Sequence, residues 1–112
     1  MADVQLVLAE RGPLPINSKA DIETDGPVAL TIAGSVWSTT PNTMVGISLY
    51  IDGQPPEFGA MIFANPASQH MALVPITVAY TFTIGTHTFE LAPMNPQTAS
   101  DQNDFFSVSV LY

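Results

Sequence analysis

The chain has 112 residues, of which 46% are hydrophobic and only 11% are charged, against a usual charged share of about 25%. Ten acidic and two basic residues give a formal net charge of −8 at pH 7, which excludes binding to the phosphates of a nucleic acid and to anionic membrane surfaces. Without cysteine the chain has no disulfide, no thiolate metal site and no cysteine nucleophile, and no apolar run approaches the roughly 20 residues needed to insert into a bilayer.

The first third of the chain shows short runs of alternating apolar and polar residues, a pattern typical of antiparallel β-strands. Residues 4–9 form the first run and place its three even-numbered residues on one face. Residues 14–26 predict an irregular segment with at most one short edge strand. Residues 28–37 predict a strand that is apolar on both of its faces.

The middle of the chain carries clear turn and break signals. Residues 45–51 alternate strictly and precede Asp52-Gly53, which predicts a tight hairpin turn with positive φ, followed by a strand at 58–64. Proline cannot donate a hydrogen bond to a neighbouring strand. Residues 70–82 therefore predict either a strand pair or one strand that is broken at Pro75.

The last third predicts a hairpin, a loop and a final strand. A short turn joins residues 80–82 to 87–91 as a hairpin, a polar loop follows at 93–103, and residues 105–112 alternate again. About eight strands predict an all-β fold, an antiparallel two-sheet sandwich that is jelly-roll-like. We expect it to form a single domain over residues 1–112.

Two segments carry a family resemblance. Residues 105–112, with the sequence FFSVSVLY, resemble the aromatic-led C-terminal strand of jelly-roll domains in the C1q and tumour-necrosis-factor superfamily. Residues 85–91, with the sequence GTHTFEL, are similar to the preceding strand in bacterial and phage relatives. The resemblance implies a jelly roll that assembles as a compact trimer and recognises ligands on its surface or between subunits.

Several predicted strands carry a second apolar face that one sandwich core cannot bury. The residues on these second faces are Ala33, Trp37, Met61, Phe63, Phe105 and Leu111. Isolated soluble proteins seldom expose apolar patches larger than a few hundred Å². We therefore expect copies of the chain to cover these faces in a homo-oligomer, and the resemblance makes that oligomer a trimer.

The loop before the last strand concentrates oxygen ligands at Asp101, Asn103 and Asp104. Ca²⁺ takes six to eight oxygens from carboxylates, amides and carbonyls, so these residues predict a calcium site. The loop also resembles the acidic, asparagine-containing loop of calcium-dependent bacterial sugar-binding sandwiches. The alternative is a solvated turn in which the same side chains bond nearby backbone amides.

Three residues are candidates for ligand binding: Trp37, Asn42 and His70. Trp37 is the lone indole and is followed by polar residues up to Asn42, and an exposed indole stacks on the apolar face of a sugar ring. Packing in the core or in an interface is the alternative. His70 lies at a loop-to-strand junction, where it could bind a ligand, whereas His87 shares a face with Phe89 and is expected to point inward and bond a backbone group.

No motif of a nucleophile elbow, a metalloprotease helix or a phosphate-binding loop is present, so we expect no enzyme. The predicted function is a non-catalytic, oligomeric module that recognises carbohydrate or another surface ligand with help from Ca²⁺. The alternative is a structural or assembly protein of a phage or particle that binds no small molecule. Because the stretch Met1-Ala2-Asp3 carries an acidic rather than a basic charge, we see no secretory signal, which leaves the cytoplasm or release without a classical signal.

Overall fold

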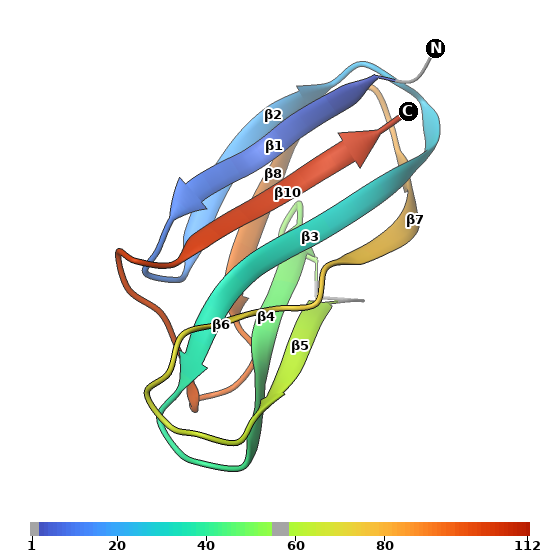
Figure 1. Cartoon of the computed structure of the whole chain (residues 1–112). Helices are drawn as coiled ribbons and strands as arrows, with labels where there is room; N and C mark the ends of the chain where they lie inside the picture. The colour runs from blue at the N-terminus through green and yellow to red at the C-terminus, as the bar shows by residue number, and fades with distance from the viewer. Residues whose placement is uncertain (1–2, 55–58) are drawn as a thin grey trace.

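The computed structural model describes residues 3–54 and 59–112, which form ten β-strands (Figure 1). The strands in chain order are β1 (Val4–Arg11), β2 (Ile16–Ile22), β3 (Gly26–Ser38), β4 (Thr43–Ile51), β5 (Gly59–Ala64), β6 (Met71–Ala72), β7 (Ile76–Phe82), β8 (Gly85–Pro93), β9 (Thr98–Ala99) and β10 (Phe105–Leu111). These described residues contain no helix that could cross a membrane.

The strands form two antiparallel sheets that face each other. One has the order β1-β10-β3-β7 and the other the order β2-β8-β4-β5. Among the eight longer strands, the chain changes sheet at every connection except that from β4 to β5, which is the winding of a jelly roll. Figure 1 shows the first sheet in front of the second. The expected all-β, jelly-roll-like sandwich of about eight strands is confirmed, with two further two-residue strands, β6 and β9.

The core lies between the sheets and is filled by alternate residues of each long strand. In β3, Leu30, Ile32 and Val36 are completely buried, and Phe82 and Phe106 close the core from the flanking strands. Burying one such side chain contributes roughly 1.5 to 3 kcal/mol. Alternation therefore fixes which face of β3 points inward and leaves every other residue on the outer face.

The first strand departs from its expected pattern. Val4 and Leu6 are exposed, while Val7 and Leu8 are both buried. The register with β10 shifts between Leu6 and Leu8, so a β-bulge turns the strand by one residue. The prediction that Val4, Leu6 and Leu8 share one face was wrong, because a bulge leaves no trace in simple alternation.

The prediction that residues 80–82 and 87–91 form a hairpin was also wrong. β7 pairs with β3, whereas β8 pairs with β2 and β4 in the other sheet. The turn at Gly85, with φ of 139°, carries the chain from one sheet to the other, and Phe82 and Phe89 both enter the core with ring centroids 6.0 Å apart. A short turn signal does not distinguish a hairpin from such a crossing.

Other turn and strand predictions are confirmed. Asp52 and Gly53 have φ of 54° and 75°, and Gln54 N–H donates to the Ile51 carbonyl at 3.1 Å, which closes a tight turn. β6 and β7 both run along β3 and are separated around Pro75, as the broken-strand alternative predicted. The expected start of β5 at residue 58 lies outside the described residues. The segment expected to be irregular contains β2, an edge strand of seven residues.

Candidate functional site

The C-terminal end of β3 is flanked by interrupted segments on both sides. On one side β6 pairs with Ser35 and Val36 and is separated from β7. On the other side β9 pairs with Trp37 and Ser38, β10 pairs only as far as Gly34, and residues 100–104 form a loop between them. Ser35 and Trp37 alternate with buried Val36, so they lie on the outer face. Side chains from both flanks meet over this part of β3.

Asp104 is the buried centre of this cluster. Its side chain has 0% exposure, and its Oδ1 accepts a hydrogen bond from Ser35 Oγ at 2.7 Å and lies 2.8 Å from His70 Nδ1. Its Oδ2 accepts the Asp101 backbone N–H at 2.9 Å, and its carbonyl accepts the Gly12 N–H at 2.8 Å. A buried carboxylate is tolerated where several donors satisfy it, so Asp104 ties the loop to β3 and to the start of β6.

Asp101 and His70 form the open side of the cluster. Asp101 Oδ1 accepts the backbone N–H of Asn103 at 2.8 Å, and Asp101 Oδ2 lies 3.5 Å from His70 Nε2. The side chains of His70 and Asp101 are 40% and 45% exposed. The hydrogen bond to Asp104, with the charges of Asp104 and Asp101, raises the pKa of His70 against a smaller opposing effect of desolvation.

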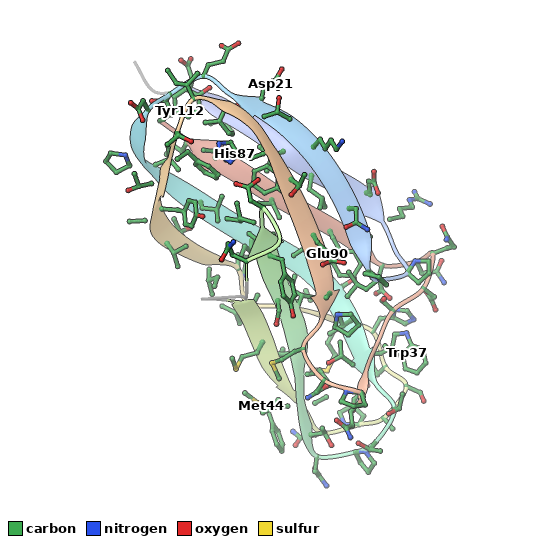
Figure 2. All side chains as sticks on the ribbon, turned by 180° about the vertical axis from the view of Figure 1, so that it is seen from behind. Asp21, Trp37, Met44, His87, Glu90 and Tyr112 are labelled. Carbon is green, nitrogen blue, oxygen red and sulfur yellow. The ribbon has the colours of Figure 1, made fainter. Side chains whose placement is uncertain are left out.

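Trp37 lies beside His70, with ring centroids 6.1 Å apart and planes tilted by 49°. The indole is partly buried, and its Nε1 atom is buried without a hydrogen-bond partner among the described residues. Figure 2 shows Trp37 at the opposite end of the sandwich from His87 and Tyr112. An aromatic pair therefore borders the open carboxylate of Asp101.

The structure brings together four of the six residues that the sequence singled out: Trp37, His70, Asp101 and Asp104. Asn103 takes part through its backbone N–H. Asn42 lies in the turn between β3 and β4, where it has φ of 53° and donates its N–H to the Asn65 carbonyl. Sequence reasoning missed Ser35, because a serine in a strand carries no signal of a buried carboxylate partner.

The donor set of the cluster is mixed. His70, Asp101 and Asp104 offer one nitrogen and two carboxylate oxygens within 4.8 Å of one another. Calcium prefers a cage of oxygens, whereas both Asp104 oxygens already accept hydrogen bonds inside the protein. The calcium site at Asp101, Asn103 and Asp104 stays a prediction.

A second histidine–aspartate pair lies near the turn between β7 and β8. His87 Nδ1 is 2.6 Å from Asp52 Oδ2, and His87 Nε2 is 2.7 Å from the Thr83 carbonyl. The His87 side chain is 12% exposed and packs edge-on against Phe82. Desolvation lowers the pKa of His87, but the hydrogen bonds to Asp52 and Thr83 outweigh it and the pKa is raised. The expected inward backbone contact is confirmed, and Asp52 is an additional partner.

Comparison with protein-family models gave no match, and neither did comparison with curated proteins. Among solved structures, the fold is similar to the C-terminal domain of EclA, a sugar-binding protein, with a TM-score of 0.50 and 14% identity over 98% of this chain and 76% of that one. It is also similar to a chain of infectious bursal disease virus, Gx strain, with a TM-score of 0.51 and 9% identity over 100% and 32%.

A third similar structure is the exo-β-1,3-galactanase of Phanerochaete chrysosporium with galactose, with a TM-score of 0.48 and 6% identity. This chain spans less than a third of the viral and fungal chains, 32% and 29%. The matches to the EclA domain and the viral chain, with TM-scores of 0.50 and 0.51, support a shared β-sandwich fold and show nothing about ligands. They leave the resemblance to the C1q and tumour-necrosis-factor superfamily unconfirmed.

Proposed function

We propose that this chain is a non-catalytic module that binds carbohydrate on the surface formed by Trp37, His70 and Asp101. The observation that carries the proposal is the meeting of an aromatic pair and an open carboxylate from three separate segments over the end of β3. Sugar rings have apolar C–H faces that stack on an indole, and their hydroxyls bond carboxylate and imidazole groups. The sugar-binding EclA domain shares the fold.

The burial of Asp104 supports binding rather than hydrolysis. Glycoside hydrolysis needs two carboxyl groups that both reach the substrate. Here Asp104 has 0% exposure and contacts Ser35, His70 and the Asp101 N–H, so of these two carboxylates Asp101 is the one that faces solvent. One accessible carboxylate can hold a hydroxyl in place but cannot supply both catalytic roles.

A glycan array followed by calorimetry with the best neutral sugar tests this proposal. We expect Trp37→Ala to weaken binding at least about tenfold, which corresponds to roughly 1.4 kcal/mol. Tyr50→Ala is the matched control, because Tyr50 pairs with Glu90 on the other sheet. Repeating the titration with Ca²⁺ and with a chelator tests the predicted calcium dependence. Failure to bind any glycan, or equal binding by Trp37→Ala, would remove the proposal.

A second candidate is an assembly protein without a small ligand, which the exposed apolar residues favour. Met44, Met61 and Phe63 are exposed by 40%, 49% and 49%, and Met44 pairs directly with Phe63 across β4 and β5. Such a patch in a chain with few charges indicates contact with another protein. We propose that it joins copies of this chain, as a trimer of the C1q and tumour-necrosis-factor kind.

Sedimentation of the whole chain separates the two candidates. A trimer that Phe63→Ser dissociates, combined with no glycan binding, favours the assembly role. A monomer at micromolar concentration would exclude both the trimer and an assembly role that depends on it.

A further inference from the structure

Two ligand atoms in the His70 cluster make no hydrogen bond to the described part of the chain: His70 Nε2 and Asp101 Oδ2. They face each other at 3.5 Å, beyond the 2.7–3.2 Å of an ordinary N–H···O bond. Both side chains reach solvent, whereas the other atoms of the cluster are engaged. The two atoms thus lie close enough for one ion to reach both.

We propose that His70 Nε2 and Asp101 Oδ2 bind a divalent transition metal, with zinc as the ion they suit best. Zinc takes histidine nitrogen and carboxylate oxygen at about 2.0–2.2 Å, so two such ligands at a tetrahedral angle lie roughly 3.3–3.5 Å apart. The observed separation of 3.5 Å matches this span. An ion between the two atoms needs no large movement of either side chain.

Each ligand is oriented by its other polar atom. His70 Nδ1 lies 2.8 Å from Asp104 Oδ1, so the N–H is held there and the lone pair of Nε2 points outward. A carboxylate behind a metal-binding histidine is the usual outer partner of zinc sites. Asp101 Oδ1 accepts the Asn103 N–H at 2.8 Å, which turns Oδ2 toward His70.

Asp104 is then a positioning residue and not a ligand. It is completely buried, and its Oδ2 is held by the Asp101 backbone N–H. The protein supplies one nitrogen and one oxygen, one ligand fewer than in a catalytic zinc site, so water or ligand oxygens would complete the two other positions of a tetrahedral ion. An imidazole nitrogen with so few oxygens suits zinc and not calcium.

The zinc site shares His70 and Asp101 with the proposed carbohydrate surface, but it can be tested with the metal alone. Tag-free whole chain is stripped with a chelator, dialysed and titrated calorimetrically with zinc chloride, and separately with calcium chloride. We expect one saturable zinc ion per chain and no calcium binding at the same concentrations. Absence of saturable zinc binding would overturn the proposal, whatever the glycan array shows.

Variants separate the proposed site from general attraction of a cation to an acidic surface. His70→Ala and Asp101→Asn should each abolish the saturable zinc binding, while His87→Gln, in the other histidine–aspartate pair, should bind zinc like the parent chain. Zinc binding that survives His70→Ala or Asp101→Asn, or that disappears in His87→Gln, would contradict the assignment.

The role of Asp104 has its own readout. Asp104→Asn should weaken zinc about 10- to 100-fold, as loss of an outer partner does elsewhere. Nitrogen NMR of the imidazole provides a second measurement that does not depend on this variant folding. Zinc should shift the Nε2 resonance of His70 and leave both resonances of His87 in place, and a shift confined to His70 Nδ1 would contradict the geometry.

Discussion

His70 and His87 each face an aspartate, but they lie at opposite ends of β3. Gly26, the first residue of β3, pairs with Phe82, whose ring contacts His87. Near the other end of β3, Val36 pairs with Met71, the neighbour of His70. The two pairs share one chemistry and differ in what surrounds the second ring nitrogen.

At His87 both nitrogens face atoms that only accept hydrogen bonds, Asp52 Oδ2 and the Thr83 carbonyl. Both nitrogens carry a proton when both contacts are hydrogen bonds, so it is the charged form of the ring that joins the turn after β4 to the turn before β8. Asp52 Oδ1 also accepts the Thr88 N–H at 2.9 Å. Neither ring nitrogen of His87 is left to bind a ligand, so we expect this pair to stabilise the fold.

At His70 only one nitrogen is engaged at hydrogen-bond distance, and the second opens toward Asp101 and solvent. The two pairs thus differ in whether the second ring nitrogen is bonded within the protein, and His70 keeps that nitrogen available for the proposed ligand. Variants at the two ends should therefore separate stability from binding.

The largest loss of stability is expected for Asp104→Ala. The change removes the shared acceptor of Ser35, of His70 and of the Asp101 N–H, and leaves three part-buried donors without it. We expect the free energy of unfolding to fall by about 3 kcal/mol. Urea denaturation measures this, with Ser35→Ala as the control that removes one hydrogen bond and costs about 1 kcal/mol. Equal losses in the two variants would show that Asp104 does not organise the cluster.

Gly12→Ala should perturb the cluster of His70, Asp101 and Asp104 by crowding the backbone of the 101–104 loop. A Cβ at residue 12 would lie 2.7 Å from the Asp101 carbonyl oxygen and 3.1 Å from the Phe106 ring. The 101–104 loop would have to shift, at a cost of about 1–3 kcal/mol in unfolding free energy. Zinc affinity should fall with it, while the His87 end stays intact. Gly53→Ala is the control. It should also lower the free energy of unfolding, because Gly53 has φ of 75°, but it should leave zinc binding unchanged.

The pair of His87 and Asp52 should make the free energy of unfolding depend on pH. Because the folded pKa of His87 is raised, its contribution is complete below the unfolded value of 6.5 and is lost as the pH rises through the folded value. The pKa of Asp52 is lowered, because its hydrogen bonds to His87 and to the Thr88 N–H outweigh desolvation, so its contribution disappears only in acid.

His87→Gln should thus destabilise the protein by about 1–2 kcal/mol near pH 6 and by less in alkaline solution. Denaturation curves are best recorded in a His70→Ala background, where His87 is the sole remaining histidine of the two. A parallel pH profile for the chains with and without His87 would show that the pair contributes no charge-dependent stability.

Much of the fold was visible in the sequence because alternation is a local property. The faces of β3 and β4 and the turn at Asp52-Gly53 follow from neighbouring residues alone. The bulge after Leu6 and the crossing at Gly85 depend on which distant strand pairs, and no local pattern encodes that choice.

The candidate site divides in the same way. Trp37, His70 and the acidic loop stand out by residue type, and the sequence marks each of them as a candidate. Their convergence depends on contacts between residues 34 and 69 positions apart, His70 with Asp104 and Ser35 with Asp104. The buried state of Asp104 follows only from the folded arrangement.

The smallest effect on stability is expected for His70→Ala, although its effect on binding is among the largest. The ring is partly exposed and Asp104 keeps its bonds to Ser35 and to the Asp101 N–H, so the unfolding midpoint should hardly change. Zinc should no longer raise that midpoint, because stabilisation by a ligand requires binding to the folded chain. Thermal melts with and without zinc provide the measurement. A large loss of stability without metal would make His70 a structural residue like His87, and the contrast between the two ends would disappear.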